Sequence, residues 1–192
     1  SEEFTRYFRD YYTKFQRCEI LHASDLDESR CKSDWNQNPT VLGNWSTENK
    51  GASIVRKLVA CSDFNFKTLS VSPIDGDIKD FNKRKQDIYL DSDIFLQLSL
   101  CEGNSYATLD ALLCGVPIVA SNVGLFYKDV PEDCFVKVNW QYNGNIEYVK
   151  DRLQEAWENR LQLSKNCRDW YLQNCSFSEW SEKTRNFIRE DI

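Results

Sequence analysis

The fold of this chain is decided by residues 95–124, which read FLQLSLCEGNSYATLDALLCGVPIVASNVG. Apolar residues predict a buried strand at 93–98, and a polar turn containing a glycine follows it. The spacing then predicts a helix from Ser105 to Cys114 and a second buried strand at 117–120. A strand, a helix and another strand in such close succession are typical of a parallel sheet covered by helices.

The same alternation extends through most of the chain. Further strands are predicted at 40–42, 66–71 and 134–138, and further helices at 51–61 and 80–89. After Asn145 the apolar spacing becomes purely helical, which predicts covering helices. We therefore predict an α/β fold, a Rossmann-like open parallel sheet flanked by helices, with covering helices at the C-terminal end.

The first part of the chain has a different character. Residues 2–17 carry aromatic side chains at helical spacing and predict an amphipathic helix, whereas residues 24–38 are charged and typical of a loop or linker. The sequence thus predicts an N-terminal helix and linker at 1–38 and a Rossmann-like domain at 39–192.

Composition excludes several classes of protein. Of the 192 residues, 41% are hydrophobic and 14% aromatic, which indicates one folded domain. The absence of methionine suggests that the sequence is a segment of a longer protein. The net charge of −6 and the lack of a basic stripe argue against a nucleic-acid partner. No apolar stretch approaches the roughly 20 residues of a transmembrane helix. The eight cysteines are scattered, and the one histidine, His22, matches no motif, so we predict no metal site. The scattered cysteines also predict a reducing, cytoplasmic location.

Polar residues gather where the strand at 93–98 ends. Ligands of an open parallel sheet bind outside the carboxyl ends of its strands. Asn104 or Ser105 can cap the following helix, whose first N–H groups form an anion site suited to a phosphate. Gly103 lets the backbone approach a ligand, and Glu102 can accept hydrogen bonds from sugar hydroxyls. Asp110 lies inside the helix and can take the hydroxyls of a ribose.

The run from Phe95 to Gly124 closely resembles the donor-binding segment of retaining GT-B glycosyltransferases (group 1, or family 4). In that family it is written as Glu-x7-Glu, followed by Glu-Ala, Cys-Gly-x-Pro and Val-Ala-Ser. The resemblance implies that Glu102 contacts the donor hexose and that Asp110, in place of the second Glu, binds the ribose. It also implies that the turn between them meets phosphate or sugar, through Gly103, Asn104, Ser105 and Tyr106.

Two upstream turns extend this resemblance. Residues 43–51 resemble the family's Gly-Arg-x5-Lys-Gly turn, in which Arg and Lys neutralise the donor diphosphate. Gly43 and Lys50 match that pattern, whereas Asn44 stands in place of the Arg. The turn after the strand at 66–71 contains Pro73 and Ile74, where the family's backbone reads the base.

The resemblance implies a hexosyltransferase that transfers sugar from a UDP- or GDP-linked donor to an acceptor hydroxyl, with retention. Glu102 and Lys50 are the predicted catalytic residues, no cofactor is expected, and an N-terminal Rossmann-like acceptor domain is expected to be missing from this chain. One alternative is a non-catalytic Rossmann-like module that binds nucleotide or serves interaction, which the departures at Asn44 and Asp110 favour. Another is a sugar-nucleotide epimerase, whose site pattern is not found here.

Overall fold

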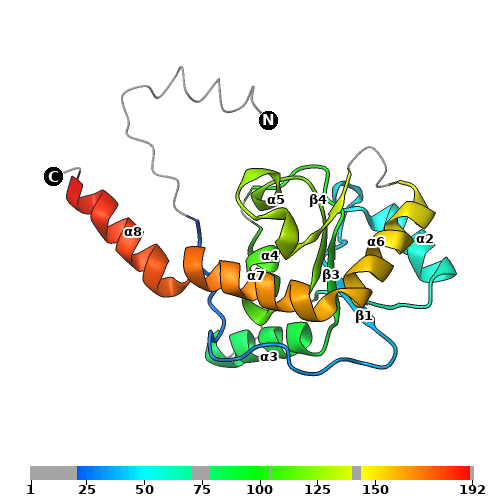
Figure 1. The fold of residues 1–192 in the computed structure, drawn as a ribbon, viewed down its shortest axis with the longest axis horizontal. Coiled ribbons are helices and arrows are strands. Elements are labelled where there is room, and N and C mark those ends of the chain that lie inside the picture. Colours follow the sequence, from blue (N-terminus) through cyan, green and yellow to red (C-terminus); the bar gives the residue numbers. More distant parts are fainter. Residues whose placement is uncertain (1–20, 71–77, 104, 140–143, 191–192) are drawn as a thin grey trace, which may run out of the picture.

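A computed structural model describes residues 21–70, 78–103, 105–139 and 144–190 of the chain, and within them one five-stranded parallel sheet. The strand order is β2-β1-β3-β4-β5 (Figure 1). The strands are β1 (Thr40–Gly43), β2 (Asn65–Thr68), β3 (Ile94–Gln97), β4 (Ile118–Ser121) and β5 (Val136–Val138). The predicted α/β class and parallel sheet are confirmed.

Helices lie on both faces of this sheet. They are η1 (Glu48–Lys50), α2 (Ala52–Cys61), α3 (Ile78–Leu90), α4 (Tyr106–Cys114), α5 (Leu125–Lys128), η2 (Glu132–Cys134), α6 (Ile146–Glu158), α7 (Arg160–Asn174) and α8 (Phe177–Glu190). Figure 1 shows α2 and α6 on one side of the strands, α3 and α4 on the other, and α8 projecting away from the sheet.

Two apolar cores result, one on each face. Because successive strand residues point to opposite faces, Leu42 and Phe95 pack with α3, α4 and α7, whereas Val41 and Ile94 pack with α2 and α6. The central strands β3 and β4 are buried on both faces, which explains why their sequences read as continuous apolar runs, whereas the edge strand β2 is mostly exposed.

Most predicted elements are confirmed with small shifts of their ends. β2 ends at Thr68 and not at 71, and residue 71 lies outside the described residues. β5 begins at Val136 because the preceding residues form η2, and the short helix α5 was not predicted. The helix predicted at 2–17 lies outside the described residues.

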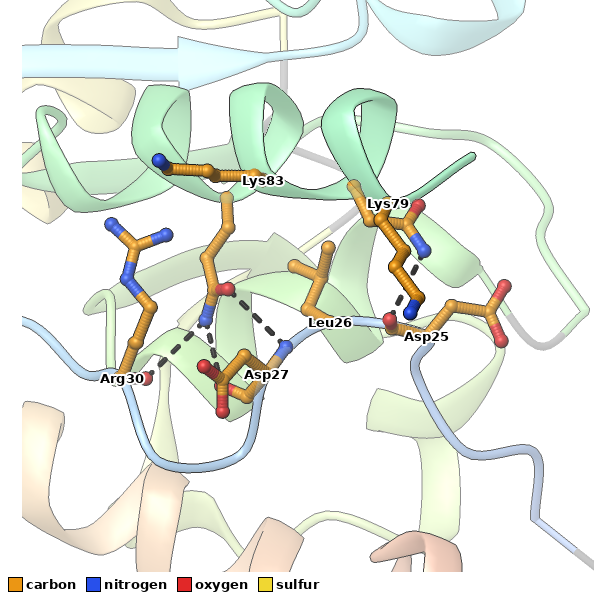
Figure 2. Close-up of a pocket in the computed structure, with 8 residues that line it drawn as sticks. Asp25, Leu26, Asp27, Arg30, Lys79 and Lys83 are labelled. Carbon is orange, nitrogen blue, oxygen red and sulfur yellow. Dashed lines mark hydrogen bonds between the residues drawn. The ribbon is translucent and has the colours of Figure 1, made fainter. Parts of the chain in front are cut away.

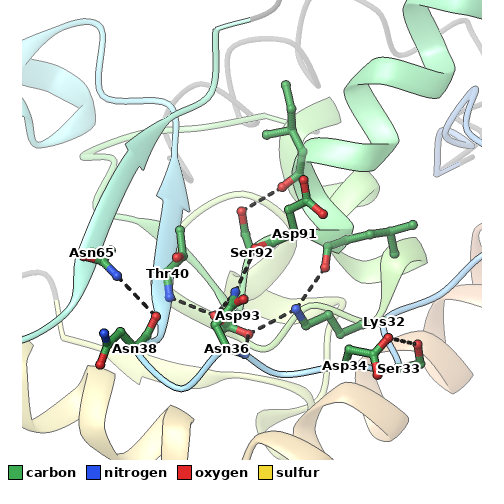
Figure 3. Close-up of polar contacts among 12 residues, drawn as sticks. Lys32, Ser33, Asp34, Asn36, Asn38, Thr40, Asn65, Asp91, Ser92 and Asp93 are labelled. Carbon is green, nitrogen blue, oxygen red and sulfur yellow. Dashed lines mark hydrogen bonds and ion pairs between the residues drawn. The ribbon is translucent and has the colours of Figure 1, made fainter.

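Residues 21–38 contain no helix or strand, as expected of a loop, yet they pack along the domain. Lys32 and Asp93 form an ion pair at 3.1 Å (Nζ to Oδ1) with side chains only 2% and 0% exposed. Lys32 also donates to the carbonyl of Leu90 at 2.9 Å, and Asp93 accepts from the backbone N–H groups of Asn36 and Thr40 (Figure 3). This network fastens the segment to the amino end of β3.

The strand order fixes where a ligand can bind. From β1 the chain moves outward to β2 and then returns to place β3 on the other side of β1. In open parallel sheets the ligand crevice lies at such a switch point, outside the carboxyl ends of the two strands, which places the candidate crevice of this fold after β1 and β3. None of the helices in the described part of the chain has the length and apolar character that a bilayer span requires.

Candidate functional site

The loops that follow β1 and β3 meet at this crevice. The N–H of Leu100 donates to the carbonyl of Asn49 at 2.9 Å, which joins the two loops directly. Gly51 packs against Leu98 so closely that an added Cβ would lie 2.7 Å from the Leu98 Cβ. Gly51 has a φ of 82°, a left-handed conformation that favours glycine, and it links η1 to α2. The turn thereby holds Lys50 at the edge of the crevice.

Lys50 and Glu102 come together there, although 52 positions separate them in the sequence. Their Nζ and Oε1 atoms are 3.1 Å apart, and the Ser99 hydroxyl donates to the same carboxylate oxygen at 2.7 Å. The side chains of Lys50 and Glu102 are 33% and 15% exposed, so the pair is held by protein yet open to a ligand. Ser99 was not predicted as a site residue, although its place three positions before Glu102 was a usable signal.

The loop that carries Glu102 is open on one side and supported on the other. An ideal Cβ on Gly103 would meet no atom of the described residues within 4 Å. At Gly124, after β4, a Cβ would collide with the Gly103 carbonyl, and the φ of 59° again favours glycine. A ligand can therefore approach the backbone at Gly103, while the β4–α5 connection supports that backbone from behind.

The N-terminus of α4 adds an electropositive end to the crevice. Ser105 precedes the helix, and its carbonyl accepts the first intrahelical bonds, from Thr108 and Leu109. The Ser105 side chain makes no capping hydrogen bond to the described residues. The first N–H groups of the helix, beginning at the turn of Ser105 and Tyr106, are suited to an anion.

Asp110 lies apart from this open surface. Its side chain is 3% exposed, and both carboxylate oxygens have protein partners. The Ser24 hydroxyl donates to Oδ1 at 2.5 Å, and Lys85 lies 3.0 Å from Oδ2. Burial raises the pKa of Asp110, and the charge of Lys85 and the hydrogen bond from Ser24 act in the opposite direction. A ribose can reach this carboxylate only after one of these partners moves.

The remaining predicted residues fall into two groups. Gly43 is required by packing, because an added Cβ would lie 2.5 Å from the Trp45 ring, whose Nε1–H donates to the Leu96 carbonyl at 3.2 Å. Asn44 is half-buried beside it and brings no positive charge. The other predicted residues, Pro73, Ile74 and Asn104, lie outside the described residues.

A separate cavity of about 570 Å³ lies between the loop at 25–30 and α3. Figure 2 shows Lys79 and Lys83 on its helix side and Asp25 and Asp27 on its loop side. Its described lining carries both signs of charge and includes none of the predicted site residues that the structure describes. Among the described residues, no group of three or more His, Cys, Asp or Glu side chains is placed to hold a metal ion.

Comparison with known proteins gives similarity in structure alone. No protein-family model matches the chain, and no curated protein matches its sequence. Among solved structures, a sucrose-phosphate synthase from Thermosynechococcus elongatus is 15% identical with a TM-score of 0.71, and the match covers 99% of this chain and 56% of that one. A glycosyltransferase from Rickettsia africae is 14% identical with a TM-score of 0.67, covering 99% of this chain and 62% of that one.

A third match concerns a single domain. The C-terminal domain of a group 1 glycosyl transferase (LpcC) from Francisella tularensis is 13% identical with a TM-score of 0.51. That match covers 83% of this chain and 97% of the other. The chain therefore spans little more than half of the sucrose-phosphate synthase but corresponds in extent to one isolated C-terminal domain.

Proposed function

Since the chain has the fold of a C-terminal domain of GT-B glycosyltransferases, we propose that it binds a nucleotide diphosphate sugar for transfer of the sugar to an acceptor hydroxyl. One observation carries the proposal. Lys50 and Glu102, from the two turns that resemble the donor-binding motifs, lie 3.1 Å apart where the loops after β1 and β3 meet. Fold alone does not determine function, so the argument rests on this pair.

The crevice offers a partner for each part of such a donor. Lys50 and the N-terminus of α4 would bind the diphosphate and stabilise its charge as it leaves, without a bound cofactor. Glu102, oriented by Ser99, would accept hydrogen bonds from the sugar hydroxyls. The open backbone at Gly103 leaves room for the ligand between these groups.

Two of the similar structures were solved with compounds of the expected kind. One is a mutant of TarM from S. aureus in complex with UDP among other ligands, which is 14% identical with a TM-score of 0.64. The other is the pneumococcal O-GlcNAc transferase GtfA in complex with UDP and GlcNAc, 12% identical with a TM-score of 0.59. They support UDP as the first nucleotide to test.

A calorimetric titration of the chain with UDP, GDP and their sugar conjugates tests the proposal. We expect saturable binding of one nucleotide. Lys50→Gln removes a charge-assisted contact and should weaken binding by roughly 10- to 100-fold. Glu102→Gln frees Lys50 from its ion pair, so it should not weaken UDP or GDP binding, but it should reduce the additional affinity of the sugar conjugate.

Lys165→Gln on α7 is the matched control, because Lys165 also forms an ion pair, 3.0 Å from Asp169, but on an exposed surface. Its titration should match the unmodified chain. Absence of binding to every nucleotide, or equal losses in Lys50→Gln and Lys165→Gln, would overturn the proposal.

A second candidate is a non-catalytic nucleotide-binding module. The observation that favours it is the loss of one cation at Asn44 together with the closed state of Asp110. Such a module would bind UDP or GDP but gain nothing from the attached sugar. Equal affinity for nucleotide and sugar conjugate, unaffected by Glu102→Gln, would favour it over the transferase.

A further inference from the structure

The carboxylate of Asp110 is held in a buried polar cluster that reaches beyond α4. Ser24 comes from the N-terminal segment and Lys85 from α3, and each contacts a different oxygen of the same carboxylate. Ser24 is 5% exposed, and its backbone N–H donates to the Tyr171 hydroxyl of α7 at 2.7 Å. The cluster therefore joins three helices to residues 21–24.

The contact made by Ser24 is chemically that of a ribose hydroxyl. An aliphatic O–H donates to a carboxylate oxygen at 2.5 Å, a length typical of a charge-assisted bond. With the Asp110 side chain only 3% exposed, no second hydroxyl can reach that oxygen while Ser24 is in place. Ser24 and a ribose would thus exclude one another.

The same segment also lies against the predicted phosphate side of the crevice. The His22 ring packs on the Tyr106 ring at the first turn of α4, with centroids 5.5 Å apart. His22 is exposed, whereas Ser24 and Leu26 are buried, and the Gln86 side-chain amide donates to the Asp27 carbonyl at 2.8 Å. We call residues 21–24 the strap: it lies over α4, is exposed at His22, and is held at Ser24 by hydrogen bonds to Asp110 and Tyr171.

We propose that residues 21–24 compete with the nucleotide inside the chain. The Ser24 hydroxyl occupies the position on Asp110 that a ribose hydroxyl would take. The inference rests on the proposed function and adds regulation to it. Nucleotide binding then requires the strap to be displaced, and whatever moves this segment controls donor affinity.

Ser24→Ala is the direct test. The substitution leaves an Asp110 oxygen without its hydroxyl partner in the free chain, and a ribose restores that partner in the complex. We expect UDP or GDP to bind about fivefold more tightly, the size of one hydrogen bond. The 2′,3′-dideoxy forms of the same nucleotides lack the hydroxyls and should show no gain.

Two further variants show whether a change in affinity comes from the Ser24–Asp110 contact, one as a control and one as a second test. Ser29→Ala removes an exposed hydroxyl of the neighbouring loop, which donates to the Asp27 carboxylate and lies away from Asp110, and it should leave affinity unchanged. His22→Ala loosens the strap at Tyr106 without touching the buried cluster. It should tighten nucleotide binding by roughly twofold, as expected for a weak ring contact.

The outcomes distinguish a failure of the competition by Ser24 from a failure of the proposed nucleotide binding. If the unmodified chain binds nucleotide and Ser24→Ala binds no more tightly, Ser24 is structural and the strap is disproved while the donor site stands. A gain that persists with dideoxynucleotides would also disprove competition at Asp110. If neither the chain nor Ser24→Ala binds UDP or GDP, the proposed function fails as well.

Discussion

At the scale of single residues, the Lys32–Asp93 pair is a sensitive point of the structure. Lys32→Met would leave the Asp93 carboxylate buried without its cation, since Asp93 is 0% exposed. Loss of one partner of a buried pair costs about 3–5 kcal/mol of unfolding free energy. Urea denaturation should show this loss, and Lys165→Met, which removes an exposed cation, should change stability by less than about 0.5 kcal/mol. Equal stability of the two variants would contradict the buried network of Figure 3.

The cysteines provide a second residue-scale test. All seven cysteines among the described residues are free thiols. Burial raises the pKa of Cys114 to about 12 and that of Cys175 to about 12, so both remain unreactive thiols at neutral pH. Cys31, Cys61 and Cys101 are exposed. A thiol reagent should modify these three rapidly in the native chain and reach Cys114 and Cys175 only after unfolding. Rapid native labelling of Cys114, identified by peptide mass, would show that α4 is not packed as described.

Part of the candidate site could be predicted from the sequence. Glu102 and Lys50 could be found because a carboxylate and a lysine follow buried strands, and parallel topology brings the ends of such strands to one edge. The partners of Asp110 could not be found, because Ser24 and Lys85 reach it from segments distant in sequence and carry no local motif. The acid expected to face a ligand is instead enclosed by protein.

At the scale of elements, the turn between η1 and α2 positions Lys50. Gly51→Ala would place a Cβ at a φ of 82° and against Leu98, so we expect a loss of about 2–3 kcal/mol in unfolding free energy and weaker nucleotide binding. The Cβ of Gly103→Ala would meet no atom of the described residues within 4 Å, so the substitution should change stability by less than about 0.5 kcal/mol, while still impeding a ligand. Thermal unfolding of both variants measures the contrast, and similar losses would mean that the Gly51 turn is not under this constraint.

Helices and strands could be predicted where apolar residues form a clear pattern in the sequence. The buried strands β3 and β4 and the helix between them follow directly from continuous apolar runs and a glycine at the end of α4. The short helix α5 was missed because four residues, Leu125–Lys128, are too few to display a helical period. The packing of residues 21–38 was also hidden, because single buried side chains such as Leu26 and Lys32 anchor an otherwise polar loop.

At the scale of the whole molecule, the proposed function makes the chain one wall of an active cleft. It spans 56% of the sucrose-phosphate synthase chain and 62% of the Rickettsia glycosyltransferase that it resembles in structure. A single wall cannot exclude water or orient an acceptor. We therefore expect the chain to bind donor and to show no sugar transfer to hydroxyl acceptors above the uncatalysed rate. Rapid transfer by the chain alone, followed by release of UDP or GDP, would refute this view.

The most direct test of the central claim is an amide NMR titration of the chain with UDP and GDP, because it reports where a nucleotide binds. The account predicts shifts concentrated at the turns after β1 and β3, at Lys50, Gly51 and residues 100–106, with smaller shifts at Ser24 as the strap is displaced. Shifts confined to the cavity between residues 25–30 and α3, or none at saturating nucleotide, would contradict a donor site built on Lys50 and Glu102.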